Sequence, residues 1–118
     1  MAKQTKRLPD LHVAGKIWIE KDGVKFFGPG PYELLTRIGE TGSLHVAAAT
    51  MGISYRKAWM IVDRLNKVMD KPMVVTQKGG NKGGGSTLSP EALALMKKYR
   101  DLATTFSVFL EKNERLMS

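Results

Sequence analysis

The stretch that most constrains the fold is Thr41–Met69, which predicts two helices joined by a tight turn. Ser43 is placed to cap the first helix, because its hydroxyl can accept a backbone N–H that the first turn leaves unpaired. Gly52 stands where a left-handed residue commonly ends a helix. Ser54 can then cap a second helix, which we expect from about Tyr55 to Met69. A short alanine-rich helix, a glycine turn and a second helix are typical of a helix-turn-helix.

The second helix of this stretch is amphipathic. Ala58, Val62, Leu65 and Met69 recur at helical spacing and predict its buried stripe, and Trp59 beside them is assigned to the core. The helix opens with a serine, a tyrosine, an arginine and a lysine, so its basic first turn could enter a DNA major groove. Paired amphipathic helices also occur in domains that bind no DNA. The rest of the chain must therefore distinguish a DNA-binding domain from another helical domain.

Composition narrows the function. A chain of 118 residues, 42% hydrophobic and 25% charged, is expected to form one globular domain. It has no cysteine, which excludes disulfides and thiolate chemistry, and its two histidines suggest no metal site. No stretch approaches the roughly 20 apolar residues of a membrane span, and no signal core follows the basic N-terminus, so a cytoplasmic location is expected. The net charge of +8 favours a polyanionic partner.

Residues 1–28 are expected to form a basic arm and a β-hairpin. Residues 16–20 and 24–27 are rich in β-branched and aromatic side chains, and the Asp22-Gly23 pair between them is a hairpin-turn signal. A glycine-proline run then breaks the strand. We expect a helix to start near Pro31, because proline suits a first helical turn.

A strand, a basic loop and a second strand follow the helix-turn-helix. The strands are predicted at residues 73–77 and 87–88, and the glycine-rich loop between them carries Lys78 and Lys82. This arrangement is typical of a wing, whose lysines can reach phosphates while bare glycine backbone approaches the sugar-phosphate chain. A Walker-type phosphate loop does not fit, because Gly85 stands where that motif needs lysine. A disordered surface loop is the other alternative.

Residues 90–118 predict one long helix. Ser89, Pro90 and Glu91 supply a cap, a first-turn proline and an acid near the positive end of the helix dipole. Such a helix would be about 40 Å long, more than a small three-helix core can cover. The remaining apolar surface predicts pairing with a second copy, and the alternative is a break at residues 103–105. The residues expected at the dimer contact are Met96, Tyr99, Leu102, Ala103, Phe106, Phe109 and Leu110.

These motifs together carry a family resemblance, which covers about residues 29–110. The two runs are LLTRIGETGSLHVAAATMGISYRKAWMIVDRLN at 34–66 and VVTQKGGNKGGGSTLSPEALALMKKY at 74–99. This region resembles the N-terminal winged helix-turn-helix domain of the ModE-type molybdate-responsive transcription regulators, which is itself similar to the DNA-binding domains of LysR-type regulators. The most specific segments are residues 41–43, 54–59 and 79–89.

The resemblance implies an α+β, mainly helical fold. It would comprise an N-terminal arm and β-hairpin (1–28), a winged helix-turn-helix (29–89) and a long C-terminal dimerisation helix (90–118). The chain would regulate transcription as a homodimer on double-stranded DNA at an inverted repeat, with recognition helix 54–69 and wing 78–86. The expected DNA contacts are Ser43, Ser54, Tyr55, Arg56, Lys57, Arg64, Lys67, Lys78, Asn81 and Lys82. Because the chain ends where molybdate-binding modules begin in full-length relatives, we carry over no molybdate site and expect no cofactor.

Two other functions remain open from the sequence. The first is a nonspecific, nucleoid-type binder of nucleic acid, and the second is an adaptor that uses a winged helix to bind protein. No Ser/His/Asp arrangement in a recognisable setting suggests catalysis, so no enzymatic activity is expected. The ratio of specific to random-sequence affinity distinguishes a regulator from a nonspecific binder. Replacing Arg56 and Lys57 by alanine would weaken a DNA reader and leave an adaptor intact.

Overall fold

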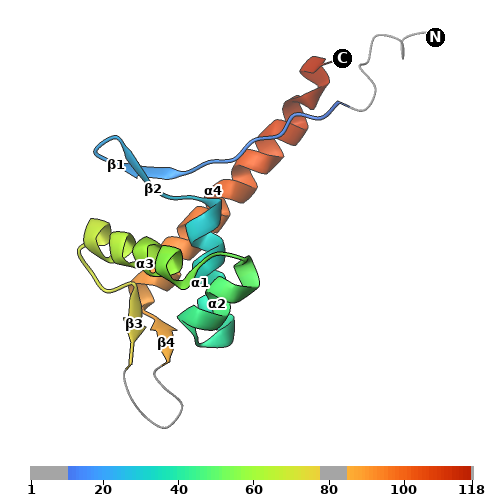
Figure 1. Cartoon of the computed structure of the whole chain (residues 1–118). Coiled ribbons are helices and arrows are strands. Elements are labelled where there is room, and N and C mark those ends of the chain that lie inside the picture. The colour runs from blue at the N-terminus through green and yellow to red at the C-terminus, as the bar shows by residue number, and fades with distance from the viewer. Residues whose placement is uncertain (1–10, 78–84, 118) are drawn as a thin grey trace, which may run out of the picture.

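A computed structural model describes residues 11–77 and 85–117. The elements in chain order are β1 (Ile19–Lys21), β2 (Val24–Phe27), α1 (Pro29–Thr41), α2 (Leu44–Met51), α3 (Tyr55–Met69), β3 (Val74–Thr76), β4 (Ser86–Leu88), α4 (Pro90–Asn113) and the short 3-10 helix η2 (Glu114–Met117). Three helices and the β3–β4 pair form the body, and α4 extends away from it (Figure 1). The predicted α+β, mainly helical class is confirmed.

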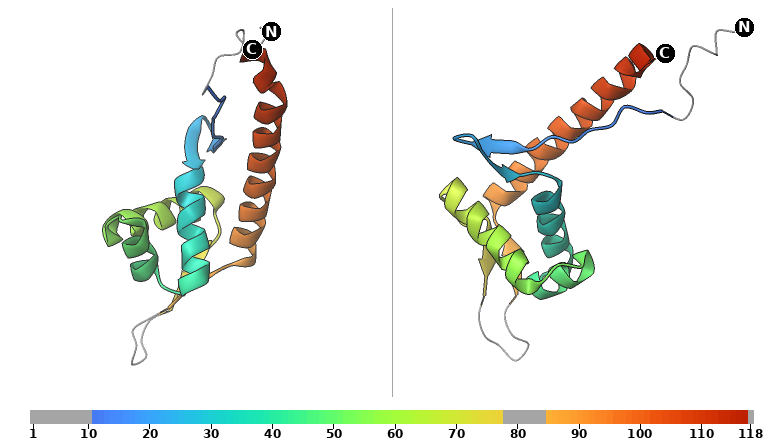
Figure 2. Two further views of the ribbon diagram at one scale, coloured as in Figure 1. Left: turned by 90° about the vertical axis from the view of Figure 1, so that its right-hand side faces the viewer. Right: turned by 45° about the horizontal axis from the view of Figure 1, so that its top comes forward.

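The N-terminal hairpin forms as predicted, with a shorter first strand. Asp22 and Gly23 both have positive φ, of 53° and 80°, as a two-residue hairpin turn requires. The expected first strand began at residue 16, but β1 begins at Ile19. The residues before β1 run instead beside α4, where the Tyr99 hydroxyl donates to the Ile17 carbonyl at 3.0 Å (Figure 2). Tertiary contacts with α4 therefore replace the ladder bonds that these residues would have made.

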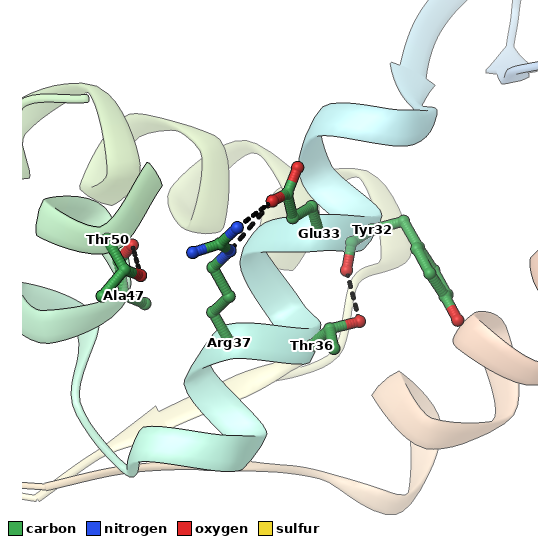
Figure 3. A network of polar contacts seen from close by, with 6 residues as sticks. All are labelled: Tyr32, Glu33, Thr36, Arg37, Ala47 and Thr50. Atoms are coloured by element: carbon green, nitrogen blue, oxygen red, sulfur yellow. Dashed lines mark hydrogen bonds and ion pairs between the residues drawn. The ribbon is translucent and has the colours of Figure 1, made fainter. Parts of the chain in front are cut away.

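The first helix of the core, α1, starts at Pro29, two residues before the predicted start. Leu34, Leu35 and Ile38 are its fully buried residues. Along α1, Arg37 bonds the Glu33 carboxylate one turn earlier, and on another side of the helix the Thr36 hydroxyl donates to the Tyr32 carbonyl (Figure 3). Arg37 is therefore paired within its own helix.

The helix-turn-helix is confirmed as predicted. The Ser43 hydroxyl accepts from the Val46 amide at 3.0 Å, and the Ser54 hydroxyl accepts from the Lys57 amide at 3.0 Å. Gly52 ends α2 with φ of +72°, in the left-handed region that glycine tolerates. Small side chains lie at the crossing of α2 and α3, where Ala47 and Ala58 are fully buried. The two helices can therefore pack closely.

The strands of the wing are antiparallel, with Val74 opposite Leu88 and Thr76 opposite Ser86. The Ser86 amide donates to the Gly42 carbonyl at 2.9 Å, which fixes β4 against the turn between α1 and α2. A Cβ at Gly39 would lie 3.0 Å from the Leu88 side chain, so the bare glycine permits this close approach of α1. The predicted loop contacts Lys78, Asn81 and Lys82 lie outside the described residues.

The C-terminal helix is continuous from Pro90 to Asn113, which excludes the alternative of a break at residues 103–105. It begins at a Ser89 cap, whose hydroxyl accepts from the Ala92 amide at 3.1 Å. Its last expected turn is the 3-10 helix η2. Within 11–77 and 85–117, none of the helices combines the length and the hydrophobicity that a membrane crossing requires.

Candidate nucleic-acid interface

The outward side of α3 carries a basic surface. Arg56, Lys57, Arg64 and Lys67 are exposed and line one shallow concavity with Asp63. Asp63 is the one acid among the described residues that line it, and it pairs with Lys67 at 2.9 Å. From Arg56 to Lys67 the surface extends about 16 Å along the helix axis, and a B-DNA major groove, about 12 Å wide, accepts a helix. The four basic side chains of α3 that are predicted to contact DNA thus share one face.

Cap hydrogen bonds define the chemistry of the two predicted serines. The hydroxyl oxygens of Ser43 and Ser54 each accept a backbone N–H at a helix start. Each hydroxyl keeps its own proton for donation. Ser54 is exposed at the edge of the basic surface, so donation to a phosphate oxygen is compatible with its capping role.

Tyr55 packs against His45 of the preceding helix. The two rings are stacked, with centroids 3.9 Å apart and planes 10° apart, although both residues are exposed. The stack restricts the Tyr55 side chain at the first residue of α3. It also places the His45 ring beside the first residue of α3.

The structure corrects the assignment of Trp59 to the core. Trp59 is 51% exposed and Met60 is 54% exposed, and both line the basic concavity. The buried side of α3 is filled by Ala58, Val62 and Leu65. Successive helical residues are about 100° apart, so the side chains directly after Ala58 turn out of the core. The signal in the sequence was the stripe itself, because Ala58, Val62 and Leu65 recur at helical spacing and Trp59 falls outside it.

The apolar stripe of α4, which we predict at a dimer contact, divides into a part buried within the chain and a part that is exposed. Met96 and Tyr99 are buried within the chain, where the Tyr99 ring lies 5.3 Å from that of Phe27. They therefore have little surface left for a second copy. Ala103, Phe106 and Leu110 are half-buried, and a Cβ at Gly15 would lie 3.2 Å from the Phe106 ring. Leu102 and Phe109 remain 53% and 57% exposed.

No family model matches the chain. It is 36% identical over 83 residues to the molybdenum transport protein ModE of Herbaspirillum seropedicae, covering 70% of this chain and 31% of that protein. It is 31% identical over 109 residues to the molybdenum-pterin-binding protein MopB of Rhodobacter capsulatus, covering 92% of this chain and 40% of that protein. It is 34% identical over 80 residues to the transcriptional regulator ModE of Haemophilus influenzae, covering 68% of this chain and 31% of that protein. The matched region is thus less than half of each relative.

A solved structure supports the same fold. The crystal structure of VV2_1132, a LysR-family transcriptional regulator, matches with a TM-score of 0.53 at 14% identity, over 71% of this chain and 27% of that one. The fold is therefore that of a winged helix-turn-helix domain similar to the one in a LysR-family regulator. The relatives named ModE add a sequence likeness over about 70% of this chain.

Proposed function

We propose that the chain is a sequence-specific, DNA-binding transcription regulator that inserts α3 into a major groove. The observation that carries the proposal is the basic face of α3, where Arg56, Lys57, Arg64 and Lys67 surround an exposed indole and thioether. Arginine can bond the O6 and N7 of guanine together, and an apolar side chain can contact the thymine methyl group. The relatives named transcriptional regulators support the same function.

We further propose that the chain binds DNA as a homodimer through α4. Leu102 and Phe109 are seven residues, about two turns, apart on one side of the helix, and both are more than half exposed. Pairing of two such stripes would remove apolar surface from water. A two-fold dimer places its recognition helices on half-sites related by an inverted repeat, about one helical turn of DNA or a multiple of it apart.

Molybdate has no part in the proposed contacts. The relatives' names refer to molybdenum, but the match covers less than half of each relative. The names of the relatives therefore carry no molybdate site over to this chain.

Selection of genomic fragments by the purified protein at near-physiological salt tests the function. Recovery of one inverted-repeat sequence is expected. Equal recovery of all fragments would favour a nonspecific nucleoid-type binder, and recovery of none would favour a protein-binding adaptor.

A pair of matched double variants tests the site. Arg56→Ala with Lys57→Ala should weaken binding to the selected sequence at least about tenfold and lower the salt slope by up to about two, because phosphate contacts and their released counterions are lost. Lys97→Ala with Arg115→Ala removes the same two charge types from exposed positions at the far helix α4–η2 and should change little. Equal losses in the two double variants would place the interface elsewhere.

A further inference from the structure

A pocket of about 330 Å³ lies between the N-terminal hairpin and the recognition helix. Its walls come from the segment before β1, from β2, from the start of α1 and from the middle of α3. The volume lies within the range of small-molecule sites, about 300–1,000 Å³. The DNA-binding proposal uses Arg64 of its lining and no other part of this space.

Three cationic side chains line the pocket, from three separate segments. Lys16 precedes β1, Lys25 lies in β2 and Arg64 lies in α3. Among the described residues that line the space, none is acidic. Positive side chains around one space make its potential favourable for an anion. The charge of the site therefore selects an anion.

The rest of the lining is apolar and includes Trp18, Phe26 and Ile61. The Trp18 ring is held from two sides. Its indole N–H donates to the Glu20 carboxylate at 2.8 Å, and the Lys25 ammonium lies 4.8 Å from the ring centroid. An inorganic anion would leave these apolar walls uncovered, whereas a carboxylate on a small apolar body would contact both kinds of surface.

We propose that this pocket binds a small organic monocarboxylate. Its charged group lies among Lys16, Lys25 and Arg64, and its apolar body lies against Trp18 and Phe26. Because Arg64 lines both this pocket and the basic face of α3, the bound carboxylate engages a side chain that DNA also uses. Ligand and DNA then weaken each other's binding by the same factor. This coupling rests on the proposed function, and the binding itself does not.

The two tryptophans of the chain allow a direct test without DNA. Trp18 lines the pocket, whereas Trp59 lines the outer face of α3. Indole N–H signals of the full ¹⁵N-labelled chain, assigned with Trp18→Phe, are followed during titration with carboxylates from benzoate to 2-naphthoate. We expect a saturable shift of the Trp18 signal and a much smaller one of Trp59. The neutral 2-naphthylmethanol and inorganic phosphate should each bind at least about tenfold more weakly than the best carboxylate.

Charge-neutral variants complete the test. Lys16→Gln and Arg64→Gln should each weaken carboxylate binding about tenfold, and Lys97→Gln on α4 should not. Equal affinity for acid and alcohol, equal responses in Arg64→Gln and Lys97→Gln, or no saturable shift with any carboxylate would overturn the proposal. A Trp18 shift on adding operator DNA, with none on adding carboxylates, would assign the three cations to DNA and also overturn it. Failure of the proposed function would look different, because the carboxylate titration would still saturate while no DNA is retained.

Discussion

The side-chain oxygen of Asn66 accepts the backbone amide of Met73 at 2.7 Å, and that of Val74 at 3.4 Å. Asn66 lies in α3 and Met73 directly precedes β3, so one side chain joins the recognition helix to the first strand of the wing. The Met73 carbonyl in turn accepts the amide of Ser89, where α4 begins. The same short segment thus sets the relative positions of the helix, the wing and α4.

Asn66→Ala should destabilise the fold and also weaken DNA binding. The variant leaves the amide of fully buried Met73 without its acceptor, which costs about 1–3 kcal/mol in the free energy of unfolding. Urea unfolding measures this loss, and titration with a selected operator measures the second effect, which follows from a displaced wing. Asn113→Ala is the control, because its amide donates to the Phe109 carbonyl at the exposed end of α4. Similar losses in both variants would contradict the role of Asn66 as a joint.

Trp59 and Met60 should read thymine methyl groups. Replacing a contacted thymine by uracil removes only the methyl group. Burial of one such group contributes about 0.8 kcal/mol to binding, so wild-type affinity should fall about threefold to fivefold for each lost contact. In a Trp59→Ala, Met60→Ala variant the same replacement should have almost no effect. The measurement is a fluorescence titration of paired operators.

A control variant separates this role from general exposure of apolar side chains. Leu93→Ala truncates a residue that is also more than half exposed but lies on α4, and it should keep the wild-type difference between thymine and uracil. An unchanged difference in the Trp59→Ala, Met60→Ala variant would exclude these two side chains from base contact.

The local signals in the sequence were sufficient for the helix-turn-helix. Ser43, Gly52 and Ser54 act on their own helix ends, and the structure shows each in the predicted role. The Asp22-Gly23 turn is likewise local. Such features depend on backbone geometry within a few residues, and for that reason a pattern could place them.

The sequence pattern could not show which surface each apolar side chain packs against. Trp59 and Tyr99 both lie near an apolar stripe, yet the first faces outward and the second is buried. The burial of Tyr99 depends on the extended segment around Ile17, which is 82 residues away in sequence. No periodicity in α4 could show that a distant strand-like segment covers one part of its stripe and leaves another part open.

The Tyr99 hydroxyl should stabilise the fold, and its contribution should depend on pH. Tyr99→Phe removes the hydrogen bond to the Ile17 carbonyl and should cost about 1 kcal/mol at pH 7, measured by urea unfolding. Burial, and then the neighbouring Tyr32, raise the pKa of Tyr99 above its ordinary value of 10.0. The folded chain therefore holds the phenolic proton more tightly than the unfolded chain does.

The sign of the pH effect follows from this linkage. The stabilisation is complete below the ordinary pKa and is lost as the pH rises through the higher folded pKa. The difference between wild type and Tyr99→Phe should thus shrink in the alkaline range. Tyr55→Phe, which alters an exposed tyrosine, should not show the cost at pH 7. A difference that grows with pH would contradict the raised pKa.

Leu102→Asp should dissociate the proposed dimer, whereas Leu93→Asp should not. Both leucines are on α4 and similarly exposed, at 53% and 55%, but nine residues place them about two and a half turns apart, on opposite sides of the helix. A charge at Leu102 would be buried between two copies, next to the Phe109 of the stripe, and would raise the dimer dissociation constant at least about a hundredfold. Light scattering after size-exclusion chromatography gives the mass of each variant.

DNA binding supplies a second measure of the same contact. A monomeric Leu102→Asp chain should lose its preference for an inverted repeat over a single half-site, because that preference comes from linking two recognition helices. Leu93→Asp should retain it. Dissociation of both variants would indicate a broader contact than the Leu102–Phe109 stripe, and a dimeric Leu102→Asp chain would place the two-fold contact on another surface of the domain.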